Sequence, residues 1–539
     1  MSQSTSRLQG CETTSSTTSR LDVLWWMILS GLIGLCYSRF FDGTYFSQDD
    51  FVWLCFSKFH PFPTEVLWTD SLCGQFFRPL GQLWWVVMHG IAGDRVIAYQ
   101  LAILTVHLCN GVLVSNLVSR LISRDAGIAA FPIFVMNPLF IARISPYYCF
   151  IFDTLGFLFF VSSIRLALAG RDSGRHWLGT TAIVAALAAY FTKETYFTLP
   201  VALVLVLGLT NGRSWSWTEL WRSRRWLSIH LSIHLIVWTM AFVWRGAIIG
   251  GFGGYGLART RTAGELGQHL AERCLTLAGL TGWSLSPHLA RWDRSELWPV
   301  IIGMGLWVLL SVLAWRLNFR IGVWWVWCWI GILWVPSVIM TTYAPVSFYG
   351  PLLGPVMLVT FIVTRCRHWR WIVLVIAADF AIWSLLYFHD RSTLMSELRQ
   401  QHRALIQTFQ DGNKNTRSGD RIMLLHGNSD LTPDPIIKYH TPTGKSAVDI
   451  LFVNSQFPVA WVVCNSWGPG RIAPMTISPD YQTGVMRIGR FEAVPLAYRN
   501  RWWDIVTAGP PFRFFDWRGA QWIEISPPSP AATRSTESK

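Results

Sequence analysis

Several ionisable residues of this 539-residue chain stand beside long apolar segments, where a charge is costly unless it has a function. Two adjacent carboxylates, Asp49 and Asp50, follow the first apolar segment in the stretch TYFSQDDFVWL; we refer to them as the acidic pair. A basic residue, Arg78, stands in FFRPL, and Lys193 precedes Glu194 in YFTKETYFTLP. Carboxylates and cations at such places indicate a site at the edge of the apolar region.

The chemistry that these residue types suit is transfer of a group from a phosphate to a hydroxyl. Two crowded carboxylates can divide the roles of proton acceptor and charged partner, and either can orient an acceptor hydroxyl. Arginine and lysine suit a phosphate, because cations stabilise both the bound anion and the charge that develops on a phosphate leaving group. The sequence predicts no metal cluster from His and Cys spacing, although the acidic pair is compatible with a hard divalent cation.

Each of these residues also has a purely structural interpretation. The acidic pair could form a turn or cap a surface helix, and Lys193 and Glu194 could be an ion pair, with each other or across helices. Asp153 in CFIFDTLGF could be a hydrogen-bond partner for a neighbouring helix. His107 and Asn110 share one helical face within LAILTVHLCNGVLVSNLV, where a buried histidine usually satisfies a polar group of another helix.

Composition places the chain among polytopic helical membrane proteins. It is 52% hydrophobic, 15% aromatic and only 14% charged, whereas soluble proteins keep about a quarter of their residues charged. Repeated apolar blocks of ~17–25 residues are long enough to cross a bilayer. The net charge of +14 does not indicate nucleic-acid binding, because the arginines fall mostly in short loops between apolar blocks.

The apolar blocks predict about eleven membrane-spanning helices. They lie near residues 23–41, 96–119, 126–144, 149–169, 177–191, 196–209, 226–248, 299–315, 321–340, 350–364 and 371–388. Arginines gather in alternate short loops, so the positive-inside rule makes those loops and the N-terminus cytoplasmic. An odd number of spans puts the C-terminus on the opposite side. We therefore expect a multi-pass protein of the bacterial inner membrane with a periplasmic C-terminus.

The same pattern divides the chain into four parts. We expect a cytoplasmic tail over 1–22, a transmembrane domain over 23–388, an external α+β domain over 389–526 and a disordered tail over 527–539. Two long external loops, about 42–95 and 249–298, belong to the transmembrane domain. FFRPLGQLWWVVMHGIAG is too short to cross and predicts a surface helix, and Cys55 and Cys73 could form a disulfide if their loop is periplasmic. The four charged sites, namely the acidic pair, Arg78, Asp153 and Lys193-Glu194, then lie at the external surface or within about two turns of it.

The order of these residues resembles that of the GT-C superfamily, polytopic glycosyltransferases that use a lipid-phosphate-linked sugar. The pattern is most similar to protein O-mannosyltransferases, their transmembrane-and-TPR relatives and bacterial lipid A aminoarabinose transferases. The resemblance covers about residues 23–390. The motifs that carry it are the acidic pair after the first helix, Arg78-Pro79-Leu80, His107 with Asn110, Asn137-Pro138, and Lys193-Glu194 before a helix containing Pro200.

The resemblance implies an inverting transfer from a polyprenyl-phosphate-linked sugar to a hydroxyl of a lipid, glycan or protein on the external face. Asp49 matches the first acid of the family's pair and is implied as the base, with Asp50 as its partner. The implied donor-phosphate contacts are Arg78, Lys193, Arg245 and Arg259; further substrate-site candidates are Glu194, Asp153, His107, Tyr147 and Tyr349.

One element departs from the family pattern. Relatives often carry an Arg-Tyr element late in the core, where this chain has Ser347-Phe348 in SFYGPLLGP. Arg245, Arg259 or Arg261 would therefore have to supply that phosphate contact.

Two other classes of function stay open. The chain could be a transporter or flippase of a lipid-linked saccharide, or a non-catalytic subunit of cell-envelope glycan assembly. Transporters are often built from internal repeats with a site at the midplane. The sequence contains no visible repeat and its charged residues gather at one surface, which favours the enzyme.

Overall fold

The computed structural model of the chain describes its helical bundle and seven strands. The described residues are 20–42, 45–46, 49–59, 63–66, 77–138, 140–141, 148–210, 225–249, 298–339, 349–409, 421–425, 449–453, 459–463, 472–480, 485–488, 513–518 and 521–525. The sequence predictions outside them include residues 1–19 and 527–539 of the two tails, the loop over 250–297 with Arg259 and Arg261, Tyr147, and the partner Cys73 of the proposed disulfide. Residues 20–22, predicted as part of the N-terminal tail, instead belong to the first helix.

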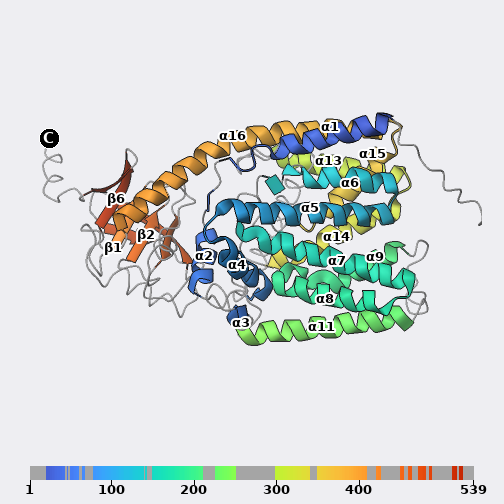
Figure 1. Cartoon of the computed structure of the whole chain (residues 1–539), viewed down its shortest axis with the longest axis horizontal. Coiled ribbons are helices and arrows are strands. Elements are labelled where there is room, and N and C mark those ends of the chain that lie inside the picture. The colour runs from blue at the N-terminus through green and yellow to red at the C-terminus, as the bar shows by residue number, and fades with distance from the viewer. Residues whose placement is uncertain are drawn as a thin grey trace, which may run out of the picture.

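The helices run side by side as one bundle, with α11 along one flank and α1 and α16 along the other (Figure 1). Their bounds are α1 (Arg20–Tyr37), α2 (Asp49–Phe59), α3 (Pro63–Val66), α4 (Pro79–Ala92), α5 (Val96–Leu121), α6 (Arg124–Val135), α7 (Ile151–Ser173), α8 (His176–Thr192), α9 (Leu199–Thr210), α11 (Arg225–Ile249), α13 (Trp298–Arg316), α14 (Arg320–Ile339), α15 (Leu353–Thr364) and α16 (Trp369–Phe409). Two short 3₁₀ turns, η2 (Tyr148–Phe150) and η3 (Glu194–Thr198), precede α7 and α9.

The bundle is that of an integral membrane protein. Four segments are long and apolar enough to cross a bilayer, namely Val96–Leu121, Tyr148–Ser173, Ile229–Ile249 and Trp369–Ala404. Shorter apolar helices accompany them, so the total of eleven crossings stays a prediction. Helix α4 has 14 residues, about 21 Å, and lies beside α2 at one end of the bundle, as a surface helix would (Figure 1).

Small residues let neighbouring helices approach closely. A Cβ atom on Gly127 of α6 would stand 2.6 Å from the carbonyl oxygen of Ser115 on α5. The Ser115 hydroxyl donates to the Gly127 carbonyl at 2.7 Å, and the Ser163 hydroxyl of α7 donates to the Ala182 carbonyl of α8 at 2.7 Å. Such contacts replace the hydrophobic driving force, which is absent between helices in lipid.

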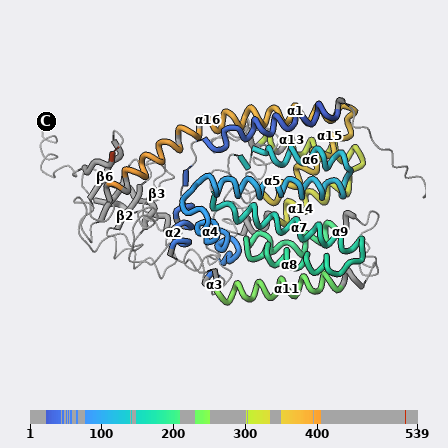
Figure 2. Tube along the Cα trace, in the orientation of Figure 1, coloured from blue at the N-terminus to red at the C-terminus, as the bar shows by residue number. Residues whose placement is uncertain are grey.

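Helix α16 continues far beyond the bundle (Figure 2). Its 41 residues span about 60 Å and contain both the last predicted crossing and the amphipathic segment that begins at His389. No proline or glycine interrupts Trp369–Phe409, so nothing in the backbone ends the helix at the membrane surface. The boundary predicted between residues 388 and 389 therefore falls inside one helix.

The strands form a single sheet in the order β5-β4-β3-β2-β1-β6-β7. β1 is parallel to β2 and β6, and the other neighbours are antiparallel. Their bounds are β1 (Arg421–Leu425), β2 (Asp449–Val453), β3 (Val459–Val463), β4 (Ile472–Asp480), β5 (Val485–Ile488), β6 (Arg513–Arg518) and β7 (Gln521–Ile525).

Five runs of the sequence predict strands, namely RIMLLHG, DILFVNS, VAWVVCNSW, GVMRIGRF and QWIEIS, and they coincide with β1, β2, β3, β5 and β7. The sequence did not predict β4 and β6. Proline explains the first omission, because β4 contains Pro474 and Pro479. The residues between the strands lie outside the described part, so a separate α+β domain stays a prediction.

The close contact at Gly127 gives a prediction about stability. Gly127→Ala should destabilise the protein by about 1–3 kcal/mol, because its methyl group meets backbone atoms of α5 that cannot move independently. Gly31→Ala on α1 is the control, since a Cβ atom there meets no described atom within 4 Å. Thermal unfolding of the purified protein in detergent measures both. Equal midpoints for the two variants would contradict the close packing of α5 and α6.

Candidate functional site

The first turn of α7 binds one member of the acidic pair. The backbone N–H of Cys149, in η2, donates to Oδ1 of Asp50 at 2.7 Å, and the Asp50 side chain is fully buried. The first N–H groups of a helix lack intrahelical acceptors and form its positive end, so a carboxylate is stabilised there. Asp50 thereby ties α2, which the acidic pair begins, to the start of α7. The side chain of Asp49 lies outside the described part.

Arg78 and Glu194 form a buried ion pair beside Phe152, which lies about one turn after Cys149. Nε of Arg78 donates to Oε2 of Glu194 at 2.8 Å and Nη2 donates to Oε1 at 2.5 Å. Each side chain is 9% exposed. The Arg78 guanidinium also lies 5.3 Å from the ring centroid of Phe152 on α7. This two-bond geometry, which arginine but not lysine can make, fixes the start of α4 against η3.

Lys193 pairs with Asp153 rather than with the adjacent Glu194. Its Nζ atom lies 3.0 Å from Oδ2 of Asp153, and the Tyr196 hydroxyl donates to the Asp153 carbonyl at 2.6 Å. Of the two arrangements that the sequence left open, the structure therefore has the cross-helix one. Lys193 ends α8 in an extended conformation, which turns it toward α7 while Glu194 faces Arg78.

Arg245 adds a third cation to the same region. Its side chain is 5% exposed, and Nη1 donates to the carbonyl of Phe77, next to Arg78, at 2.9 Å. It also lies within electrostatic reach of Glu194. We call Arg78, Lys193, Arg245, Glu194 and Asp153 the cation cluster. With all five ionised, three positive charges face two negative ones, so these five residues have a net charge of +1 before the neighbouring Asp50 carboxylate is counted.

Residues 149–153 contact both Asp50 of the acidic pair and the cation cluster. Cys149 holds Asp50, Phe152 lies under Arg78 and Asp153 pairs with Lys193. These three positions span about 6 Å of helix. One carboxylate of the acidic pair and members of the cation cluster therefore contact the same short segment at the start of α7.

His107, Asn110 and Tyr349 form a separate network among α5, α7 and the segment before α15. Nε2 of His107 donates to the Val135 carbonyl at 2.9 Å, so Nδ1 accepts the Tyr349 hydroxyl at 2.7 Å. The Asn110 amide donates to the same hydroxyl at 3.1 Å and to the Thr154 carbonyl at 2.8 Å. Both nitrogens of the buried imidazole have protein partners, which is the arrangement of a structural network.

The contacts that α16 makes beside the acidic pair could not be predicted from the sequence. The His402 ring lies 5.0 Å from the rings of Tyr45 and Phe51, which flank the pair in sequence. Arg399 lies 5.5 Å from the Tyr45 ring centroid. Burial raises the pKa of Tyr45 to about 12, although Arg399 acts in the opposite direction, so its hydroxyl is neutral at pH 7. A sequence likewise does not show which backbone N–H, such as that of Cys149, will bind a side chain.

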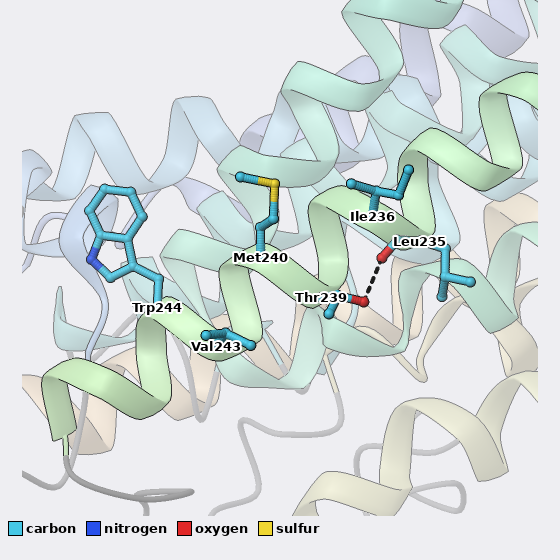
Figure 3. A pocket seen from close by; sticks show the side chains of 6 residues that line it. All are labelled: Leu235, Ile236, Thr239, Met240, Val243 and Trp244. Carbon is cyan, nitrogen blue, oxygen red and sulfur yellow. Dashed lines mark hydrogen bonds between the residues drawn. The ribbon is translucent and has the colours of Figure 1, made fainter.

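An apolar hollow of about 560 Å³ lies along α11 (Figure 3). Its lining residues are Leu235, Ile236, Thr239, Met240, Val243 and Trp244. The one hydroxyl among them, of Thr239, donates to the Leu235 carbonyl at 2.9 Å, so the wall offers only apolar contacts. Arg245 of the cation cluster follows Trp244 directly. The lining side chains are exposed along one helix, whereas the Arg245 side chain is buried, so the hollow is an open apolar surface of α11.

The described residues contain no group of three or more His, Cys, Asp or Glu side chains placed to bind a metal ion.

The Arg78–Glu194 pair gives a second prediction. Glu194→Ala should destabilise the protein by about 3–5 kcal/mol, because it leaves the Arg78 charge buried without its partner. The double variant Arg78→Met/Glu194→Leu should be more stable than Glu194→Ala. Chemical unfolding in detergent measures each variant, with Asp22→Asn as the control, because the exposed Asp22–Arg370 pair should contribute less than about 1 kcal/mol. Additive losses in the double variant would contradict a coupled pair.

Comparison with known proteins supports the fold. No protein-family model and no curated protein matches the chain. Among solved structures it is similar to ArnT from Cupriavidus metallidurans in the apo state, with 12% identity and a TM-score of 0.51 over 81% of this chain and 87% of that chain. The crystal structure of ArnT bound to undecaprenyl phosphate is similar at 12% identity, with a TM-score of 0.47 over 81% and 86% of the two chains. The chain accordingly has a fold similar to that of ArnT.

Proposed function

We propose that the protein is a membrane glycosyltransferase that moves a sugar from a polyprenyl-phosphate-linked donor to an acceptor hydroxyl at the external membrane surface. The observation that carries the proposal is that Asp50 of the acidic pair and the cation cluster both contact residues 149–153, where η2 leads into α7. Such a transfer needs a base for the hydroxyl and a cation for the phosphate within one small volume. The GT-C-like fold adds to this proposal.

The donor would lie with its phosphate at the cation cluster and its apolar chain along α11. The net charge of +1 leaves the cluster complementary to an anion even though its members are paired with one another. The hollow beside Arg245 offers apolar surface that continues into the lipid. A donor dissolved in the bilayer could then enter sideways, which explains why the charged residues gather at a membrane surface.

The acidic pair would divide its work between chemistry and positioning. Asp50 is fully buried and accepts the Cys149 N–H, so we assign it the role of anchoring α2. Asp49 would take the proton of the acceptor hydroxyl while that oxygen attacks the anomeric carbon of the sugar. The bond from that carbon to the phosphate oxygen breaks, and polyprenyl phosphate leaves with the electron pair. A single displacement of this kind inverts the anomeric configuration.

The acceptor would approach from the end of the bundle where α2, α4 and the C-terminal sheet lie (Figure 1). In the proposed topology this end is periplasmic, the N-terminus is cytoplasmic and the membrane is the bacterial inner membrane. The sheet, reached through α16, would cover the site or recognise a lipid, glycan or protein acceptor. A divalent cation at the acidic pair is compatible with this scheme.

Substitutions in the acidic pair test the base. With purified protein and radiolabelled polyprenyl-phosphate sugars, Asp49→Asn should lower the transfer rate by about 10²–10⁴-fold, because it removes the proton acceptor. Asp50→Asn keeps an oxygen that can accept the Cys149 N–H and should retain more activity than Asp50→Ala. Asp42→Asn, an exposed carboxylate of the same loop, is the control. Transfer at the wild-type rate by Asp49→Asn would exclude Asp49 as the base, and lipid translocation without any transfer would instead indicate a flippase.

Substitutions in the cation cluster test donor binding. Arg245→Gln and Lys193→Gln should each weaken binding of polyprenyl phosphate by about tenfold, because each removes one charge-assisted contact to the phosphate. Titration of the purified protein with the lipid, at low and high salt, measures this. Met240→Ala in the hollow should weaken binding of a long-chain phosphate more than that of a short-chain one. Equal affinities of wild type and the two glutamine variants would contradict the assigned phosphate site.

A further inference from the structure

At the end of the bundle opposite the candidate site, three arginines gather between α5 and α7. α5 begins next to α4 and the acidic pair and ends at Leu121, so Arg120 lies at its far end (Figure 1). Nη2 of Arg120 donates to the Leu168 carbonyl of α7 at 3.2 Å. Arg165 and Arg171 of α7 lie within electrostatic reach of Arg120.

These arginines have more positive charge than their carboxylate partner can offset. Asp172 forms ion pairs with Arg120 and with Arg171, the latter at 3.0 Å, and is itself 49% exposed. One carboxylate therefore serves two guanidinium groups. Arg165 is the third cation, and its Nη1 atom is buried with no hydrogen-bond acceptor among the described residues.

Arg165 lies inside a membrane-spanning helix, so leaving its buried Nη1 donor without an acceptor is unfavourable in free energy. Arg165 precedes the end of α7 at Ser173 by more than two turns, about 12 Å of helix, and stands in the apolar run SSIRLALAG. The positive-inside rule accounts for arginines in the loops, but it does not account for one inside the helix with a buried donor. A buried charged donor without an acceptor is unfavourable, so the arrangement indicates an acceptor that comes from outside the chain.

We propose that Arg120, Arg165 and Arg171 bind the phosphate of an anionic lipid headgroup in the leaflet opposite the candidate site. A phosphate offers several strong acceptor oxygens, which match the fork of a guanidinium and supply the acceptor that Nη1 of Arg165 lacks. A lipid is favoured over free phosphate because Arg165 stands inside the apolar span, from which its long side chain can extend its charged end toward the headgroup region. This inference does not depend on the proposed function, which concerns the other membrane surface.

The lipid would act as a bridge between two helices. Arg120 comes from the end of α5 and the other two arginines from α7, so one phosphate held by all three would join the helices in addition to the Arg120–Leu168 hydrogen bond and the Arg120–Asp172 ion pair. We therefore expect anionic lipid to stabilise the whole protein, since α7 contacts both α5 and α8 at the centre of the bundle.

The test compares lipid-dependent stability of the full chain and its variants. Wild-type protein in phosphatidylcholine nanodiscs should unfold at a higher temperature once phosphatidylglycerol is included, and native mass spectrometry should detect retained phosphatidylglycerol. Arg165→Gln should lose most of this rise and bind phosphatidylglycerol about tenfold more weakly. Arg124→Gln removes an exposed arginine at the same end of the bundle and should keep the whole effect.

Three outcomes would overturn the proposal. The first is an equal midpoint for wild type in the two lipid compositions, and the second is an equal loss in Arg165→Gln and Arg124→Gln. The third is full protection by inorganic phosphate in detergent without lipid, which would assign the site to a free anion.

If Arg165→Gln does not fold, Arg165→Lys provides a second test, because it keeps the charge and removes the guanidinium fork. This variant should give an intermediate dependence on phosphatidylglycerol. A dependence equal to that of wild type would contradict recognition by the guanidinium fork.

Discussion

The constraint on which this structure depends is that a charge at the edge of a bilayer must be offset by a charge or dipole from another segment. The beginning of α7 meets this constraint for three segments at once. Its first N–H groups bind Asp50 from α2, Phe152 lies under Arg78 from the start of α4, and Asp153 pairs with Lys193 from the end of α8. If α7 moved, three charged side chains would lose partners together, which is why the neighbouring loops and short helices are fixed here.

An anion-binding site differs from a self-contained network of ion pairs, because the charges of its residues do not cancel one another and a net positive charge remains. Arg78 and Glu194 alone would neutralise one another, and so would Lys193 and Asp153. Arg245 shifts the balance, because it binds the Phe77 carbonyl, a neutral group, and therefore adds a cation without adding a carboxylate. The helix that places Arg245 also presents the apolar hollow, so one element provides both a positive charge and a path for hydrocarbon.

The sequence predicted the membrane class and the grouping of the charged residues, since both follow from hydropathy and from where arginines fall along the chain. It could not predict the partners. Lys193 and Glu194 are adjacent, yet an extended residue at the end of α8 sends them to different helices. Asp50 binds a backbone N–H, which every residue but proline has, so no residue type points to it. The boundary at residue 388 reflected a change of composition, whereas the backbone of α16 has no reason to end there.

The two ends of α7 lie beside side chains of opposite charge, and the helix dipole is favourable for both. Its N-terminus is the positive end of the helix dipole and holds the Asp50 carboxylate, whereas its C-terminal turn is the negative end and contains Arg171. The 23 residues between them form a rod of about 35 Å, close to the thickness of a bilayer. Charged contacts at both membrane surfaces fix the depth of such a rod, because sliding it in either direction would move a charge into hydrocarbon. The proposed transfer would need its base and its phosphate site at one constant depth, and α7 contacts two members of the cation cluster, Arg78 and Lys193, at one end.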